Sequence, residues 1–544
     1  SGYWSGMVTI DQYDEVSETW VSIKRLNSTK SGSSFNESGT VDEPCLIRVI
    51  NETSILFAVP NGYAADNDSL GKLTLSSQVT TQRGIGIIVS LLGTAVGGKF
   101  KYAIIRVVEP FVYDVFSDEW AESAWSKEKG YPSQVAFYEN RLLFASNYAN
   151  PNLLWLSKTN DIKRFFPSRI IKDDDYFNHP LPLPRASVIQ SVVSMGELIV
   201  FLDDGEWKFF SSDGPLTPKS ASSKVQSYNG SSYVDPLTIN NKILMLSQNS
   251  TRVQEYAYNN NADSFLATDI SLYSEHMFRR TKIESWAFQK DPESIIWMVK
   301  EDGTLIGLTY LKEEEIFGYH RHITEGKILD VESLKSEDGN EVWFVVDRGT
   351  KDNPRYSIEK FKYHMEFEPT FHDSYALDCF SVCFSETPTS NFKAGSANLS
   401  LRKKTCVALV DGNYEDGIEV DEFGAFDLSV PAKRVIIGLP FEQVMETLPF
   451  DLSGGSGQSS MDKQNPKSIM IRFNNSFMPF AEFNGDNKAY QLKFGNRYYG
   501  KPNEPFSGLS EAKSLPNEPD CEKRLKVFMK KPFPMTITSI SAKV

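Results

Sequence analysis

The stretch Gly130-Tyr-Pro-Ser-Gln-Val-Ala-Phe-Tyr-Glu-Asn-Arg-Leu-Leu-Phe-Ala145 decides the fold, because it holds two apolar strands joined by a tight polar turn. The same unit returns four more times before residue 364, each time with a third short strand. The second strands are Arg141–Ala145, Glu197–Phe201, Lys242–Leu246, Ser294–Met298 and Glu341–Val345. The third strands carry Trp155, Trp207, Val253, Leu305 and Ile358, which are 52, 46, 52 and 53 residues apart. A period of this length, with several strands per unit, indicates the blades of a β-propeller.

The composition agrees with a chain built from strands. Its 544 residues are enough for two to four domains, and the aromatic content of 12% favours pleated, half-buried strands. Helical periodicity is nearly absent, and its best candidate is the short stretch Phe441–Thr447. We therefore expect a mainly β fold, with a β-propeller-like domain inserted in or flanked by β-sandwich or barrel-like platform domains.

Changes of pattern along the chain suggest three domains. Residues 1–129 form a β platform domain, 130–364 the propeller-like repeat and 365–544 a C-terminal β domain that packs with the N-terminal segment. Strands are expected over Trp20–Lys24, Cys45–Ile50, Ile55–Val59 and Tyr102–Val108, and Ser28–Thr40 is expected to be a loop because it is rich in Ser and Gly. The last strand, Met535–Ser541, alternates as a strand with one buried face does.

Charge and cysteine usage restrict the partners. A net charge of −14 argues against a grip on nucleic acid over most of the surface, but it suits a wall past which DNA slides. The five cysteines, at positions 45, 379, 383, 406 and 521, show no disulfide framework. Cys379 and Cys383 are expected to be buried thiols on one face of a strand. The basic run Lys523–Lys531 is expected to be a lysine-guarded edge strand or a contact with an acidic neighbouring subunit.

Motifs for catalysis, cofactors and metals are incomplete. Gly93–Lys99 resembles a phosphate-cradling loop, but Phe100 stands where Ser or Thr would hold Mg²⁺. Asp411–Gly417 resembles a calcium loop, but it lacks the central glycine and the final glutamate, so we expect a solvated turn. The sequence therefore predicts no catalytic, cofactor-binding or metal-binding residues, no cofactor and no enzymatic activity.

Three further groups leave alternatives open. His320 and His322 share one face of a strand, where we favour stacking or hydrogen bonding at a blade edge over a metal pair. Asp173–Asp175 and Glu313–Glu315 are the densest acidic groups, and we expect solvated loop charge for both. A pair of glycosidase carboxylates stays open, because such a pair is defined by a separation in space.

Several of these stretches resemble one family of viral proteins. The 130–145 stretch resembles the "GYP…V.F…RL.FA" segment of the tail nozzle (tail tubular protein B-like) proteins of short-tailed bacteriophages. Other family motifs follow in order: "W.S…D" at Trp155, Ser157 and Asp161, "GEW…GPLTP" at 205–218, "DGTL.GLTY…RH" at 302–322, and "DG…GLP…TLP" at 411–449. The resemblance covers about residue 117 to the end.

The resemblance implies a non-enzymatic structural subunit of the virion tail, assembled in the cytoplasm of the host bacterium. Family members form a ring, typically hexameric, below the portal and the head-to-tail adaptor ring. The ring extends the channel, retains the packaged genome and conducts DNA during ejection without sequence-specific binding. Tail fibres or spikes dock nearby, and contact with the host cell envelope is a further expectation. The rival interpretation is a β-propeller tail protein that binds carbohydrate or cleaves glycan.

Overall fold

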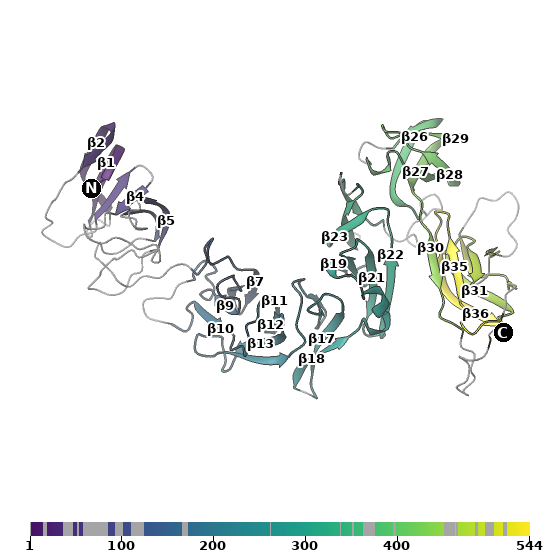
Figure 1. Cartoon of the computed structure of the whole chain (residues 1–544), viewed down its shortest axis with the longest axis horizontal. Helices are drawn as coiled ribbons and strands as arrows, with labels where there is room; N and C mark the ends of the chain where they lie inside the picture. Colours follow the sequence, from purple (N-terminus) through teal and green to yellow (C-terminus); the bar gives the residue numbers. More distant parts are fainter. Residues whose placement is uncertain are drawn as a thin grey trace. The chain divides into compact units, whose positions relative to one another are not determined.

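In a computed structural model of the chain, the described residues form almost only β-strands (Figure 1). The structure describes 2–14, 19–35, 47–51, 54–57, 85–92, 102–109, 124–165, 172–261, 263–337, 339–350, 353–362, 376–394, 399–450, 463, 466–484, 488–494, 505–514 and 519–543. The chain divides into two compact units, Ser1–Phe201 with Trp207–Val225, and Leu202–Glu206 with Gln226–Val544. No helix of the described residues has the length and apolar character needed to cross a membrane.

The N-terminal sheet has six strands in the order β2-β1-β3-β4-β6-β5. It consists of β1 (Gly2–Asp14), β2 (Thr19–Phe35), β3 (Ile47–Asn51), β4 (Ser54–Phe57), β5 (Ile85–Leu92) and β6 (Tyr102–Glu109). The four strands predicted here are present. The loop predicted at Ser28–Thr40 is wrong for residues 28–35, which belong to β2, and residues 36–40 lie outside the described residues. There β2 continues, because antiparallel pairing with β1 supplies hydrogen bonds that outweigh a Ser- and Gly-rich composition. The phosphate-loop-like segment Gly93–Lys99 lies outside the described residues.

Five successive sheets confirm the predicted repeat, and the fold is mainly β and β-propeller-like. Four sheets have four strands and the fifth has three, and in each the strands follow one another in chain order. The first two contain β7 (Gln134–Tyr138), β8 (Arg141–Ala145), β9 (Leu153–Leu156), β10 (Phe177–Pro180), β11 (Ile189–Met195), β12 (Glu197–Leu202), β13 (Gly205–Ser211) and β14 (Ala221–Ser227). The other three contain β15 (Leu237–Ile239), β16 (Lys242–Leu246), β17 (Val253–Asn259), β18 (Ser264–Asp269), β19 (Ile283–Gln289), β20 (Ile295–Lys300), β21 (Leu305–Leu311), β22 (Ile316–His322), β23 (Lys327–Ser336), β24 (Gly339–Asp347) and β25 (Tyr356–Lys360).

The turns between first and second strands match the polar pairs that the sequence offers. Glu139 and Asn140 both have positive φ, 50° and 59°, which is the geometry of a two-residue hairpin turn. Gly196, Asn240 and Gly339 also have positive φ at the equivalent turns. Asn and Gly adopt such angles at low cost, so four of the five units turn back where the sequence predicts it.

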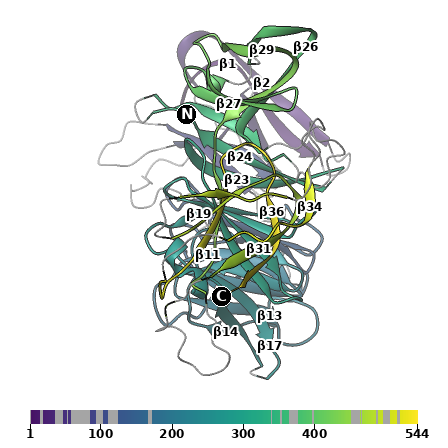
Figure 2. The same cartoon turned by 90° about the vertical axis from the view of Figure 1, so that its right-hand side faces the viewer.

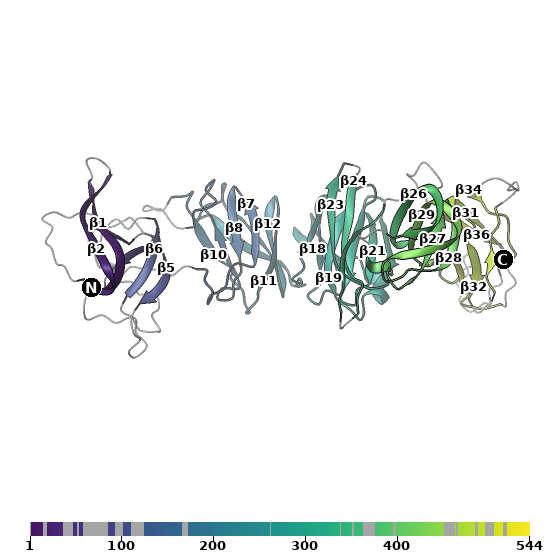
Figure 3. The ribbon, with the colours of Figure 1, turned by 90° about the horizontal axis from the view of Figure 1, so that it is seen from above.

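The stacking of neighbouring sheets explains why β20 is apolar at successive positions. Ile296 and Met298 pack with residues of the third sheet, such as Leu244. Trp297 and Val299, on the opposite face, pack with residues of the fifth sheet, such as Phe344. Successive side chains of a strand point to opposite faces of the sheet, so a sheet that is covered on both faces needs apolar residues at successive positions. Figure 3 shows β23 and β24 next to β19 and β21.

The C-terminal part contains three sheets. The first has the order β26-β29-β27-β28 and its own core. A four-stranded sheet, β30-β35-β32-β33, and a three-stranded sheet, β34-β31-β36, share a second core and form a β-sandwich; Figure 2 shows β31, β34 and β36 side by side. The strands are β26 (Asp378–Lys393), β27 (Thr405–Val410), β28 (Asn413–Glu419), β29 (Ala425–Leu439), β30 (Gln443–Glu446), β31 (Ser468–Ser476), β32 (Phe480–Phe483), β33 (Tyr490–Gln491), β34 (Phe506–Leu509), β35 (Leu525–Met529) and β36 (Thr536–Lys543). Two 3-10 turns, η2 (Leu272–Met277) and η5 (Leu399–Leu401), complete the described elements.

The four predictions for this part have different outcomes. The helical candidate Phe441–Thr447 is wrong, because it contains β30, which pairs with β35. The edge strand predicted for the basic run is also wrong, because β30 and β32 pair with the two sides of β35; a contact with an acidic neighbouring subunit stays a prediction. The last strand has one face on the sandwich core, where Ile537 and Ile540 of β36 pack. The turn predicted at Asp411–Gly417 is confirmed only for Asp411 and Gly412, whose φ is 46° and 85°, because β28 begins at Asn413.

Candidate functional site

The buried charged residues are the natural starting point for a site, because a charge removed from water needs partners. Among the described residues, the buried charged side chains are those of Arg141, Asp175, Glu206, Glu255, Arg348 and Lys523. Partners gather around Arg141, Glu206 and Arg348, and a histidine pair on β22 forms a fourth group.

Arg141 begins β8 and is the most buried arginine of the first unit, with 1% exposure. Its guanidinium donates to the carbonyl oxygens of Ser157 at 2.7 Å and Asp175 at 2.6 Å, and more weakly to that of Leu216 at 3.4 Å. Burial lowers the pKa of Arg141, while the charges of Asp174 and Asp175 oppose that shift. Arg141, Ser157 and Leu216 lie in three sequence stretches that are far apart in the chain, and this contact brings them together.

The acidic stretch Asp173–Asp175 is only partly the solvated charge that we expected. Asp173 is exposed, but Asp175 is fully buried, and its carboxylate accepts the backbone N–H of Lys172 at 2.9 Å. The reason is the neighbouring Arg141, whose positive charge and donors draw this loop inward. The other acidic group, Glu313–Glu315, is exposed as expected.

Glu206, in the "GEW" motif, is fully buried in β13. Its Oε2 accepts the hydroxyl of Ser227 at 2.5 Å and the backbone N–H of Asn229 at 3.3 Å, while Oε1 has no hydrogen-bond partner among the described residues. Burial raises the pKa of Glu206, and the donors of Ser227, Asn229 and Gly230 oppose the shift. The carboxylate thus closes the turn after β14.

His320 and His322 make the contact that we favoured over a metal pair. Nδ1 of His320 lies 2.7 Å from Nε2 of His322, and both rings meet Trp297 edge to face. They lie on β22, the edge strand of its sheet. The His320 ring covers Gly307, where an added Cβ would lie 2.1 Å from it. Gly307 and His320 are cross-strand partners in the β21–β22 hairpin.

Arg348 is the functional candidate that the sequence analysis missed. Its side chain is 1% exposed, and it pairs with Glu359 at 2.5 Å and Asp378 at 3.2 Å. Nη1 also donates to the hydroxyl of Thr324 and to the carbonyl of Glu325, each at 2.6 Å. Burial alone would lower the pKa of Arg348, but its hydrogen bonds and the two carboxylates raise it. A lone arginine after the apolar strand Glu341–Val345 is the one signal that could have pointed to it.

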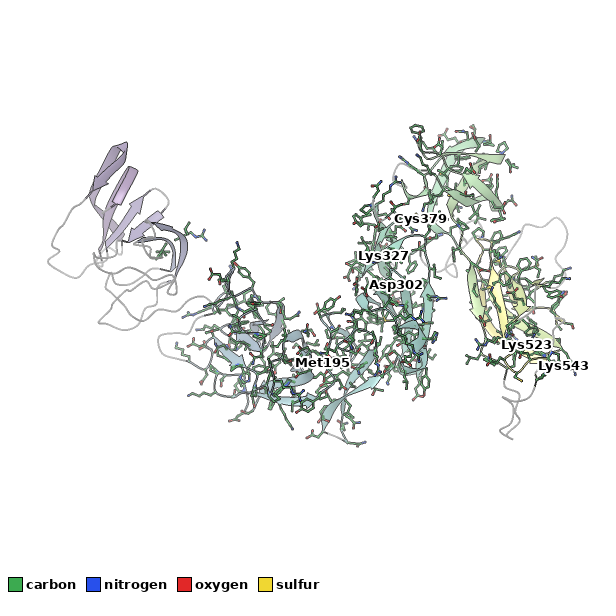
Figure 4. All side chains as sticks on the ribbon, viewed as in Figure 1. Met195, Asp302, Lys327, Cys379, Lys523 and Lys543 are labelled. Carbon is green, nitrogen blue, oxygen red and sulfur yellow. The ribbon has the colours of Figure 1, made fainter. Side chains whose placement is uncertain are left out.

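The same cluster contains Cys379, which Figure 4 labels. Burial and the charge of Glu359 raise the pKa of this thiol to about 12, so it stays protonated at neutral pH. Cys383 is buried and Cys379, partly buried, packs against the same core, so the predicted shared face is confirmed but full burial of Cys379 is not. Cys379, Cys383, Cys406 and Cys521 are free cysteines, and Cys45 lies outside the described residues.

Part of the basic run Lys523–Lys531 has partners within the sandwich, while Lys530 and Lys531 are exposed. The ammonium of Lys523 donates to the carbonyl of Asn484 at 3.2 Å and lies over the ring of Phe483. Lys526 pairs with Glu482 at 3.3 Å, on the strand next to β35. These contacts replace the solvent exposure that an edge strand would give.

Three buried carboxylates of the described residues are bound to separate partners, and two partly buried ones share an arginine. Asp175 accepts a backbone N–H of its own loop, Glu206 binds Ser227, and Glu255 accepts the hydroxyl of Tyr310 at 2.9 Å and pairs with Lys312 at 3.1 Å. Glu359 and Asp378 share Arg348, which lowers the pKa of Glu359 although burial alone would raise it. Carboxylates held in this way stabilise the sheets. The described residues also contain no group of three or more His, Cys, Asp or Glu placed to hold a metal ion.

Comparisons with known proteins add little to this picture. No protein-family model matches the chain, and no curated protein matches it. Among solved structures, Raptor from Chaetomium thermophilum is 11% identical with a TM-score of 0.28, and the match covers 57% of this chain and 27% of Raptor. A luciferin-regenerating enzyme is 10% identical with a TM-score of 0.25, covering 57% of this chain and 92% of that one. Likeness at this level carries no argument about activity.

Proposed function

We propose that this chain is a structural subunit of a phage tail nozzle ring. In this role it extends the channel of the portal and adaptor, retains the packaged genome, and conducts DNA during ejection. Its partners are further copies of itself in a hexameric ring, the head-to-tail adaptor ring, and neighbouring tail fibres or spikes. The protein then acts by assembly in the virion and not by catalysis.

The observation that carries the proposal is that residues of the family motifs contact one another. Arg141 binds the carbonyls of Ser157 and Leu216, and His320 covers Gly307. Arg141, Ser157 and Leu216 belong to three motif segments that are separate in the sequence, whereas Gly307 and His320 belong to one segment and pair across the β21–β22 hairpin. A resemblance whose pieces form mutual contacts supports a shared framework more strongly than the same pieces scattered over the surface.

The charge of the chain supports passage of DNA. The net charge of −14 leaves a predominantly acidic surface, and the exposed turn Glu313–Glu315 is one part of it. Phosphates are repelled by such a surface, so DNA slides past it without being retained. A basic wall would slow ejection by binding the genome.

Electron microscopy of the purified chain, alone and with its adaptor and tail partners, tests the proposal. Rings with a central channel and head-to-tail contacts between subunits are the expected result. Compact monomers, even with the partners present, would contradict it. A glycan-binding and glycan-cleavage screen would then test the rival function, a carbohydrate-active tail protein.

A further inference from the structure

The C-terminal sandwich carries a charge of the opposite sign to that of the rest of the chain. Residues 443–544 contain 14 basic and 10 acidic residues, whereas the preceding 442 residues contain 43 basic and 61 acidic ones. This part is therefore weakly basic in a protein whose net charge is −14. A charge asymmetry of this kind indicates a surface for an acidic partner.

Four lysines of the sandwich lie around the beginning of β31, and we call them the lysine cluster: Lys467, Lys488, Lys513 and Lys543. The backbone N–H of Lys467 donates to the carbonyl of Lys543 at 2.6 Å, where β31 begins and β36 ends. Lys513 exchanges two backbone hydrogen bonds of 2.9 Å with Ile469, so it lies beside the same strand. Figure 4 labels Lys543 at this end of the sandwich.

Tyr490 brings two members of the cluster together. Nζ of Lys488 lies 5.3 Å from the centre of its ring, and Nζ of Lys513 lies 5.8 Å from it. Three members of the cluster are exposed and Lys513 is half-buried. Among the described residues none of the four has an ion-pair partner, although the exposed Glu511 is only two positions from Lys513. Ammonium groups gathered in this way repel one another, so a carboxylate from another molecule would lower their energy.

An acidic turn of the same unit lacks cations in the same way. Glu313–Glu315 are exposed between β21 and β22, and a backbone hydrogen bond from Glu315 to Lys312 at 3.1 Å closes the turn. The ammonium of Lys312 is bound elsewhere, because it pairs with Glu255 at 3.1 Å and lies over the ring of Phe317. In the part of the chain that the structure describes, the three glutamates have no ion-pair partner.

We infer that the lysine cluster of one copy binds the acidic turn of a second copy. Each of the two surfaces lacks a counter-charge among the described residues of its own chain, and each supplies what the other lacks. The contact joins two different surfaces, so it is heterologous, and contacts of this kind close into a ring when the rotation between copies allows it. The inference rests on the proposed assembly of copies and adds the surfaces through which they meet.

The observations favour an acidic protein surface over DNA as the partner. Duplex DNA needs an extended basic surface because its phosphates are spaced along the whole helix, whereas the cluster is compact and most of the chain is acidic. The acidic turn is compact as well, and Leu311 and Ile316 on its two sides are 37% and 45% exposed. With Tyr490 they offer apolar contact beside the charges, as is usual at protein interfaces.

Sedimentation analysis of the full chain at low and high ionic strength tests the inference. Wild type is expected to self-associate at low ionic strength and to dissociate as salt screens the contact. The variant Lys488→Glu, Lys513→Glu should self-associate about tenfold or more weakly, and so should Glu313→Lys, Glu314→Lys. A mixture of the two variants should recover association, because the native lysines of one then meet the native glutamates of the other, and the exchanged charges also match.

Two further variants make the test specific. Lys335→Glu, Lys433→Glu is the matched control, because both lysines are exposed, lie outside the cluster and change the net charge by the same amount. It should leave self-association unchanged. Lys467→Glu, Lys543→Glu alters only exposed members of the cluster, and it replaces the first pair of substitutions if that pair lowers the thermal stability.

Four results would contradict the inference. Wild type could stay monomeric at low ionic strength, both lysine variants could associate as wild type does, the control could lose association equally, or the mixture could fail to recover. Binding of a short duplex DNA that Lys488→Glu, Lys513→Glu abolishes, with self-association unchanged, would instead assign the cluster to nucleic acid.

Electron microscopy of the same proteins separates this inference from the proposed function. Rings that form equally in wild type and in Lys488→Glu, Lys513→Glu would leave the nozzle proposal intact and contradict the lysine contact. Salt-dependent association that requires the lysine cluster, but gives no rings even with the tail partners, would support the contact and contradict the nozzle proposal.

Discussion

The guanidinium of Arg348 lies 3.2 Å from the carboxylate of Asp378, and this ion pair joins the last repeat sheet to the first C-terminal sheet. Arg348 follows β24, and Asp378 begins β26. Glu359 of β25 binds the same guanidinium, so one buried cation connects strands of two sheets. The connection between these two parts of the second unit therefore depends on a charged contact as well as on apolar packing.

Replacing Arg348 with Met should destabilise the second unit by about 3 kcal/mol, because two partly buried carboxylates lose their counter-charge. Urea unfolding measures the change. Lys360→Met is the control, since Lys360 pairs with Glu341 at 2.9 Å but is 48% exposed, and it should cost less than about 1 kcal/mol. Equal effects of the two substitutions would contradict the role given to Arg348.

The Arg348 cluster should also weaken in acid. The pKa of Glu359 is lowered in the folded protein, chiefly because Arg348 outweighs the effect of burial. The stability from this group is therefore present above the unfolded pKa of about 4.3 and is lost as the pH falls through the folded value. The free energies of unfolding of wild type and Glu359→Gln, measured with urea, should become more similar as the pH falls. A constant difference between them at every pH would contradict a lowered pKa of Glu359.

Glu206 should show the opposite pH dependence. Burial raises its pKa, so its contribution to stability is complete below the unfolded pKa of about 4.3 and is lost as the pH rises through the folded value. Relative to Glu206→Gln, the wild type should lose stability progressively as the pH rises above about 4.3. Unfolding midpoints of both proteins, measured at a series of pH values, test this pH dependence. If the midpoints of wild type and Glu206→Gln change in parallel with pH, the pKa of Glu206 is not raised.

Gly307→Ala should destabilise the fourth sheet by about 1–3 kcal/mol, because the new Cβ meets the His320 ring. The double variant Gly307→Ala, His320→Ala should recover part of this loss, and thermal unfolding measures all three proteins. Gly318→Ala is the matched control on the neighbouring strand, since its Cβ would meet only Cβ of Thr309, at 3.8 Å. A similar cost at Gly318 would show that the loss at Gly307 is a general effect of strand glycines.

Arg141→Met should destabilise the first unit by about 3 kcal/mol or more, because the carbonyls of Ser157 and Asp175 lose a charged donor. The stability of Arg141→Lys should lie between those of wild type and Arg141→Met, because an ammonium cannot reproduce the planar fork of a guanidinium. Chemical denaturation of the three proteins measures their order of stability. Arg185→Met serves as an exposed control and should change stability by less than about 0.5 kcal/mol.

The repeat was predictable because its signals are local. Alternating apolar positions and turn residues such as Asn140 and Gly196 specify strand and turn within a few residues. The same rules failed at Phe441–Thr447 and at Ser28–Phe35. There, pairing with β35 and with β1 decided the conformation, and a short window does not contain the partner strand.

By itself, the sequence determined the β character of the chain, the repeat period, the turns and the shared face of Cys379 and Cys383. These properties follow from the two-residue alternation of a strand and from the few residues that accept positive φ. Only the tertiary structure decided that β35 is an interior strand, that Asp175 is buried, and that Arg348 joins two sheets. Those outcomes depend on donors and acceptors distant in the chain, because a buried charge is stable only where folding brings its partners to it.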